Sequence, residues 1–258
     1  MVAAGSVLSA AQHALANSKR PWGVRRDAML AFERLLLAFC EQNAVAEAEL
    51  TTVLAPHFAE LNRLYEAFET ELEVNFAHSI LEGKERLSDY TLFDRFERLI
   101  CAEGELCSLQ SGDRVMMIGS GPLPLTAILL ASRFNVNVIG IERDYHSAAI
   151  SQRVIRQLGL ETQISILHSD GASSSLHEAT CVLVAVLARP KHRILESILK
   201  NRGVCRKVIC RTSYGARQAL YGPTPPGALL KYAVTQSNIA RRDQTISSLI
   251  LEVPHSSR

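Results

Sequence analysis

In the first part of the chain, apolar side chains recur every three or four positions, a spacing that gathers them on one face of an α-helix. Such stripes cover residues 29–39 and residues 58–80. Gly83 is expected to end the second of these helices, and the capping residues that follow predict a third helix over residues 88–99. We therefore expect an all-helical N-terminal domain, residues 1–110.

The pattern changes at residues 111–113, where short apolar runs begin to alternate with helical stripes. This alternation predicts a largely parallel sheet with right-handed crossovers. Two β-runs with no helix between them close the chain, which predicts an antiparallel edge. We therefore expect residues 111–258 to form an α/β domain of the Rossmann type. Its expected strands are residues 114–118, 137–141, 163–167, 181–187, 206–211, 230–237 and 246–253, and its expected helices are residues 122–134, 145–158 and 190–201.

The first strand of this region ends in a glycine turn. Gly119 and Gly121 allow positive φ angles and let a ligand approach the backbone closely. Pro122 and Pro124 follow, and we expect both in the first helical turn, where a missing N–H has no partner to lose. Glu142 ends the second strand, at the edge of the sheet where an acid can hold both ribose hydroxyls. This βαβ unit therefore predicts a ligand that contains a nucleotide or nucleoside.

The glycine loop departs from the dinucleotide pattern G-x-G-x-x-G, because Pro124 stands at the third glycine position. A nucleoside without a pyrophosphate fits better, and S-adenosylmethionine is the common one. Asp170 follows the third strand, where its carboxylate can accept a hydrogen bond from an adenine amino group. Two alternatives stay open, namely a glycine turn that binds nothing and an aspartate that only forms a turn. The expected ligand contacts are Gly119, Ser120, Gly121, Pro122, Glu142, Asp170, Gly171 and Ala172.

The composition narrows the choice of partners. A net charge of +2 and 6% aromatic residues favour neither a basic face for nucleic acid nor base-stacking surfaces. No apolar stretch is long enough to span a membrane. The first residues lack the basic start of a signal peptide, so we expect a helix there and not a signal peptide. The six cysteines form no C-x-x-C motif, and no histidines have zinc-site spacing. We expect a reduced cytoplasmic protein without a metal, and a homodimer is left open.

Two stretches of the α/β region resemble the nicotianamine synthase family. Residues 119–126 read G-S-G-P-L-P-L-T, which is the strand-loop signature of that family. Residues 211–221 match the family element R-S-A-H-G-x-R-x-x-L-Y, with Tyr214 in place of its histidine. The resemblance covers about residues 65–225.

Two helical stretches are similar to the same family. Residues 72–76 read L-E-V-N-F where the family has L-E-x-H-F, so that Asn75 replaces a histidine. The element N-Y-x-N-L-x-x-x-E is partly kept as Tyr90, Leu92 and Glu97. The resemblance therefore extends over both expected domains.

This resemblance implies a class I methyltransferase-like Rossmann domain preceded by a helical one. It also implies transfer of the aminobutanoyl part of S-adenosylmethionine, not of its methyl group, with no metal required for catalysis. In its length the chain resembles the bacterial branch of the family, which makes opine metallophores of the staphylopine and pseudopaline type. Members of that branch use the α-amine of histidine as acceptor and release methylthioadenosine.

The match to the L-E element makes Glu73 the candidate base, and Tyr90 could orient Glu73 or bind the amine. The alternatives are a glutamate on a solvated helix face and a tyrosine that only packs. Arg211 could pair with a carboxylate of donor or acceptor, or instead with a neighbouring helix. His78 could contact the acceptor, or could instead lie at the surface. The expected substrate contacts are Arg211, Tyr214, Tyr221 and His78.

Three other functions stay open at this point. A nicotianamine-like synthase could use another amine as acceptor. An ordinary methyltransferase would use the same donor and release S-adenosylhomocysteine. A binding protein on the same scaffold would catalyse nothing, although the intact glycines and the two acids at strand ends argue against it.

Overall fold

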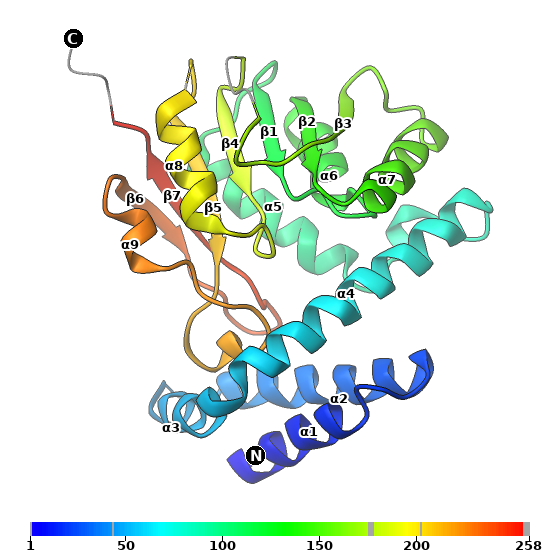
Figure 1. The fold of residues 1–258 in the computed structure, drawn as a ribbon, viewed down its shortest axis with the longest axis vertical. Coiled ribbons are helices and arrows are strands. Elements are labelled where there is room, and N and C mark those ends of the chain that lie inside the picture. Colours follow the sequence, from blue (N-terminus) through cyan, green and yellow to red (C-terminus); the bar gives the residue numbers. More distant parts are fainter. Residues whose placement is uncertain (1, 43, 175–177, 202, 255–258) are drawn as a thin grey trace. The chain divides into compact units, whose positions relative to one another are not determined.

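The computed structural model describes residues 2–42, 44–174, 178–201 and 203–254. By the packing of its backbone, the chain divides into two compact units (Figure 1). The first, here called the helical unit, consists of Met1–Glu71, Thr212–Pro223 and Ile239–Ser247. The second, here called the sheet unit, consists of Leu72–Arg211, Thr224–Asn238 and Ser248–Arg258.

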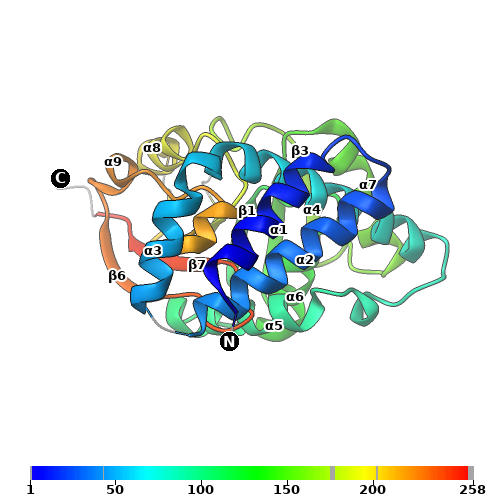
Figure 2. The ribbon, with the colours of Figure 1, turned by 90° about the horizontal axis from the view of Figure 1, so that it is seen from below.

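The helical unit contains the helices α1 (Ala4–Ala16), α2 (Trp22–Cys40), α3 (Ala44–Leu54) and the first part of α4 (Phe58–Leu81), together with the 3-10 turns η1 (Ala55–His57) and η3 (Gly215–Ala219). α1 lies beside α2 (Figure 2) and buries Val7, Ala11 and Ala14, which recur at helical spacing. α3 was not predicted, since its apolar stripe is weak. Its Glu47 accepts a hydrogen bond from the N–H of Ala216 at 3.3 Å, which ties η3 into the unit.

A seven-stranded sheet forms the centre of the sheet unit. Its strands are β1 (Arg114–Ile118), β2 (Asn137–Glu142), β3 (Ile164–His168), β4 (Cys181–Val184), β5 (Lys207–Thr212), β6 (Ala233–Asn238) and β7 (Ser247–Glu252). The order across the sheet is β3-β2-β1-β4-β5-β7-β6. β1 to β5 pair in parallel and β6 runs antiparallel to β7, which confirms the predicted parallel sheet with an antiparallel edge.

The helices of this unit are α5 (Phe93–Cys107), α6 (Leu125–Phe134), α7 (Tyr145–Gln157), α8 (Lys191–Asn201) and α9 (Pro226–Leu229), and η2 (Leu87–Asp89) is a 3-10 turn. α5 and α6 cover one face of the sheet and α8 covers the other (Figures 1 and 2). The strands β1 and β4 between them are buried along almost their whole length. Cys181 and Cys210 are buried free thiols.

Three expectations differ from the structure. The helix expected over residues 88–99 is replaced by the 3-10 turn η2 and by α5, which starts at Phe93 and continues to Cys107. The division by packing falls inside α4, after Glu71, and not at residue 110. The reason is that α5 buries Ile100 and Cys107 in the same core as the sheet, and helical spacing alone cannot show which partner a helix packs against. α6 begins at Leu125, so the two prolines before it lie outside the helix; Pro124 is the N-cap, with a non-helical ψ of 46°.

Among the residues that the structure describes, no helix combines the length and the apolar content needed to cross a membrane.

Candidate functional site

The signature loop, residues 119–126, leaves β1 at the carboxyl edge of the sheet. Gly119 and Gly121 have φ angles of 87° and 69°, which confirms that both positions need glycine. The N–H of Gly119 donates to the carbonyl of Ile141 at 2.8 Å. The N–H of Gly121 donates to Oε2 of Glu142 at 2.9 Å. The loop is therefore fixed to the end of β2 by its own backbone.

Glu142 is held at this edge by a second hydrogen bond. Its Oε1 accepts from the N–H of Asp144 at 2.9 Å, and the side chain is half-buried. Asp144 in turn caps α7, since its carboxylate accepts from the N–H of Ser147 at 2.7 Å. These hydrogen bonds to Ser147 lower the pKa of Asp144 below its ordinary value. The acid that was predicted for the ribose thus sits on a rigid strand end.

The loop after β3 lies against the end of β1. A Cβ on Gly171 would overlap Cγ2 of Ile118, the last residue of β1, so only glycine permits this approach. Asp170 forms the turn, because its Oδ1 accepts from the N–H of Ala172 at 2.9 Å. The turn-forming alternative is therefore present, and it uses only one carboxylate oxygen. The structure brings residues 170–172 to the same edge as the signature loop.

Glu73 of α4 reaches the signature loop. A Cβ on Gly121 would stand 2.7 Å from Oε2 of Glu73, closer than Cβ atoms approach other atoms in proteins. Glu73 and Glu142 thus meet Gly121 from two elements, the first at its Cα and the second at its N–H. The sequence allows two interpretations of Glu73, a catalytic base or a glutamate on a solvated helix face. In the structure its side chain is half-buried and lies at the loop.

The other predicted residues of the sheet unit lie in different settings. Tyr90 is 4% exposed and packs its ring 4.9 Å from that of Phe76 on α4. His78 is exposed, which is the surface position named as its alternative. Ser120 is buried, and its side chain lies over Gly140 of β2. Among the described residues, no group of three or more histidine, cysteine or acidic side chains is placed to hold a metal ion.

Arg211 is buried in an ion pair. Its guanidinium is 2% exposed and donates to both carboxylate oxygens of Glu103 on α5, each at 2.9 Å. A third hydrogen bond, of 3.1 Å, reaches the hydroxyl of Thr126, and the hydroxyl of Ser248 donates to the same carboxylate. The pair with a neighbouring helix was the alternative to substrate binding, and the structure shows that pair.

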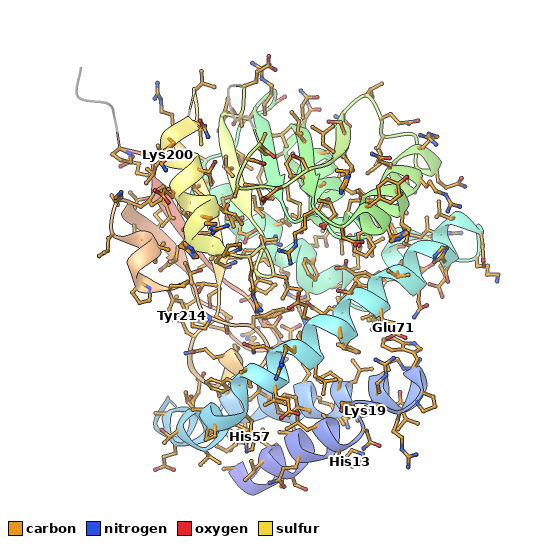
Figure 3. All side chains as sticks on the ribbon, viewed as in Figure 1. His13, Lys19, His57, Glu71, Lys200 and Tyr214 are labelled. Atoms are coloured by element: carbon orange, nitrogen blue, oxygen red, sulfur yellow. The ribbon has the colours of Figure 1, made fainter. Side chains whose placement is uncertain are left out.

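Two predicted substrate contacts belong to the helical unit. Tyr221 is 1% exposed, and its hydroxyl donates to the carboxylate of Glu69 within the unit. Tyr214, labelled in Figure 3, is 41% exposed at the start of η3. Tyr214 therefore stays a predicted acceptor contact, while the hydroxyl of Tyr221 is engaged inside the protein.

Lys191 and Glu103 were not singled out by the sequence analysis, although a signal was present. Lys191 lies on the face of α8 that buries Ile194, Leu195 and Ile198. Glu103 lies on the face of α5 that buries Ile100 and Cys107, and is 0% exposed. A charged residue on the apolar face of a helix is buried with that face and needs a polar partner there. The positions of Lys191 and Glu103 in the apolar stripes were therefore a sign of buried polar interactions.

The strand order, the glycine loop after β1 and the acid at the end of β2 define an α/β protein of the Rossmann type, with the architecture of class I methyltransferases. The structure of MtNAS in complex with MTA and tNA has the same fold, with a TM-score of 0.87 over 97% of this chain and 98% of that one, at 20% identity. A mutant of MtNAS in complex with S-adenosylmethionine gives a TM-score of 0.81 over 95% and 98% of the two chains, also at 20% identity.

The family model described as nicotianamine synthase protein matches residues 21–256, and the chain therefore belongs to the nicotianamine synthase family. It is 22% identical over 182 residues to an L-histidine 2-aminobutanoyltransferase of Yersinia pestis, across 69% of this chain and 66% of that protein. It is 25% identical over 185 residues to a Pseudomonas aeruginosa protein of the same name, across 70% and 68% of the two chains. It is 24% identical over 216 residues to nicotianamine synthase 9 of Hordeum vulgare, across 75% and 62%. The chain thus spans just under two thirds of the Yersinia and Hordeum proteins.

Proposed function

We propose that this protein transfers the 2-aminobutanoyl group of S-adenosylmethionine to the α-amine of histidine and releases methylthioadenosine. Membership of the family and the names of the two bacterial relatives support this activity. The observation that carries it is the meeting of Glu73 and Glu142 at Gly121 of the signature loop. On this basis we assign Glu142 to the donor and Glu73 to the acceptor.

The donor would lie across Gly119–Pro122, with its ribose on Glu142 and its adenine beside residues 170–172. Glu142 can accept ribose hydroxyls because two backbone N–H groups occupy only part of the acceptor capacity of its carboxylate. The Cβ positions of the two glycines face the methyl groups of residues 185 and 188 and the carboxylate of Glu73. The donor would therefore approach the backbone of the loop, which carries no side chain at Gly119 or Gly121. The residues of this edge therefore fit an adenosine with a sulfonium substituent.

In the transfer itself, the lone pair of the acceptor amine attacks the γ-carbon of the aminobutanoyl chain. The bond between that carbon and sulfur breaks with its electron pair on sulfur, so the sulfonium becomes the neutral thioether of methylthioadenosine. Glu73 takes the proton that the attacking nitrogen loses, and ends protonated. Since the sulfonium is already activated, the protein mainly has to orient the two substrates and accept this proton.

Tyr90 is assigned to the surroundings of the acceptor, and the contact expected for Tyr214 of the helical unit stays a prediction. Tyr90 packs on Phe76, three residues along α4 from Glu73, and so could fix the helix face that presents the base. We assign Arg211 to the protein interior instead, because its guanidinium is already bidentate on Glu103. The six free cysteines accord with our placement of the enzyme in the reducing cytoplasm.

The acceptor is tested by mass spectrometry of reactions that contain the enzyme, S-adenosylmethionine and one amino acid at a time. We expect histidine to gain one aminobutanoyl unit on its α-nitrogen. The product then offers imidazole, secondary amine and carboxylate ligands, which suit a borderline metal. A gain of the same unit by a different amine, with none on histidine, would keep the chemistry and overturn the acceptor.

A further inference from the structure

Lys191, the first residue of α8, is buried, and among the residues that the structure describes its ammonium group contacts backbone carbonyls and no carboxylate. It is 6% exposed, and its ammonium group points back at the segment that connects β4 to α8. Nζ lies 2.7 Å from the carbonyl oxygen of Ala185, 2.8 Å from that of Val186 and 3.5 Å from that of Ala188. Burying a cation is costly, so an arrangement that satisfies it with backbone carbonyls needs a reason.

The held segment, residues 185–190, lies between β4 and α8 at the carboxyl edge of the sheet. The N–H of Ala185 donates to the carbonyl of Ile118 at 3.0 Å, next to the signature loop. Arg143, which follows β2, donates to the carbonyl of Arg189 at 3.1 Å. Two cationic side chains therefore bind four carbonyls of one short segment.

This segment supports the signature loop. A Cβ on Gly119 would lie 3.2 Å from Cβ of Ala185 and 3.3 Å from Cβ of Ala188, which places both alanine methyl groups directly against the glycine. Gly119 has a φ of 87°, a conformation that other residues rarely adopt. The position of the segment thus helps to set the backbone that the donor is proposed to contact.

We propose that Lys191 is a positioning residue for the donor: its ammonium group keeps residues 185–190 packed against Gly119, and so keeps the signature loop in the shape that receives the donor. This inference rests on the proposed function. Without the ammonium group, the carbonyl of Ala185 would keep only the N–H of Ala188, at 3.1 Å, and those of Val186 and Ala188 would lose the donor that Lys191 supplies. The segment would then move to reach water, and Gly119 would lose its support.

The charge on Lys191 matters for this role. An ammonium group offers three hydrogens to the three carbonyls, whereas a neutral amine offers fewer and weaker ones. The pKa of Lys191 is lowered from 10.5 to about 8, mainly by burial; Cys210 opposes this shift, and the nearby Arg189 and Arg211 add to it. The ammonium form therefore predominates below about pH 7, is half lost at about pH 8 and disappears as the pH rises further.

The test compares Lys191→Met with Lys200→Met, using methylthioadenosine as the titrated ligand in a calorimeter. Lys200 lies on the same helix, is 69% exposed and pairs only on the surface with Glu196 (Figure 3). We expect Lys191→Met to bind roughly tenfold more weakly at about pH 7, and Lys200→Met to bind like the unaltered protein. Binding of methylthioadenosine by Lys191→Met at the unaltered affinity would overturn the proposal.

A second measurement does not depend on how well the variant folds. In the unaltered protein, the affinity for methylthioadenosine should fall between about pH 7 and about pH 9.5, because the ammonium of Lys191 is lost in this range. This ligand lacks the amino and carboxyl groups of the donor, so its own ionisation does not contribute. An affinity that stays constant over this range would contradict the role of Lys191. If the unaltered protein bound neither methylthioadenosine nor S-adenosylmethionine at any pH, the proposed function itself would fail.

Discussion

Glu73 shows how the setting of a single residue separates a catalytic role from a solvated one. In sequence it lies beside an apolar stripe with other glutamates, and such residues mostly face water. In the structure its carboxylate lies against Gly121, at the edge where the donor is proposed to bind. This position is why we propose Glu73, among the glutamates of α4, as the base.

Glu73→Gln should keep the affinity for S-adenosylmethionine and reduce turnover by about 10²–10⁴-fold, since an amide cannot accept the proton. Gln and Glu have similar helix propensities, so α4 should persist. The matched control is Glu60→Gln, an exposed position on the same helix, which should behave like the unaltered enzyme. Steady-state kinetics decide the matter; turnover of Glu73→Gln within a factor of about two of normal would return Glu73 to the solvated face.

At the scale of elements, the turn from β1 into α6 requires glycine both for its backbone conformation and for its contact with Glu73. Gly121 must be glycine for two separate reasons, its φ of 69° and the carboxylate of Glu73 in the place of a side chain. Gly159 shares the first reason only, with a φ of 68° and no atom within 4 Å of the Cβ position. A comparison of substitutions at Gly121 and Gly159 therefore separates the effect of backbone strain from the effect of contact with Glu73.

Both Gly121→Ala and Gly159→Ala should lower the free energy of unfolding by roughly 1–2 kcal/mol, because alanine is strained in this conformation. Only Gly121→Ala should also lower turnover, by roughly 10²-fold, because the added methyl group displaces Glu73. Urea unfolding and steady-state rates give the two quantities. Equal turnover in the two variants would mean that the contact at Gly121 has no catalytic consequence.

The elements of the sheet unit could be predicted from the sequence, because short apolar runs and helical stripes alternate there with glycine and proline between them. β1 was predicted with its observed bounds, and β2 and α7 to within one residue. α3 was missed because its apolar residues do not concentrate on one face. The start of α6 was placed too early, because a proline is equally acceptable as the N-cap that Pro124 forms.

At the scale of the whole molecule, stability depends on interactions between residues far apart in sequence. Arg211 at the end of β5 and Glu103 on α5 form a pair that is almost fully inaccessible to solvent. Removing one partner leaves the other charge buried and uncompensated, which is far more costly than the loss of a surface pair.

Arg211→Met should therefore lower the free energy of unfolding by about 3–5 kcal/mol. Arg114→Met is the control: its pair with Glu178 is exposed, at 50% and 72% of the side chains, and its loss should cost at most about 1 kcal/mol. Denaturant unfolding followed by circular dichroism measures both. A normal stability for Arg211→Met together with a raised KM would restore the original prediction that Arg211 binds a substrate carboxylate.

The parts of the site that follow strands could be predicted, because the carboxyl ends of parallel strands meet at one edge of a sheet. Gly119, Glu142 and Asp170 were found in this way, and the structure brings them together. The partners of Arg211, Lys191 and Tyr221 could not be predicted, because they come from other elements and no local pattern specifies them. The division after Glu71 has the same origin, since it reflects packing and not periodicity.

The nucleoside released by the reaction tests the central claim most directly, because it shows which carbon on the sulfonium was attacked. The enzyme is mixed with S-adenosylmethionine and histidine, and the products are separated by chromatography. The account predicts methylthioadenosine, formed in equal amount with the aminobutanoyl derivative of histidine. Accumulation of S-adenosylhomocysteine would contradict it, since that nucleoside forms only when the methyl group is transferred.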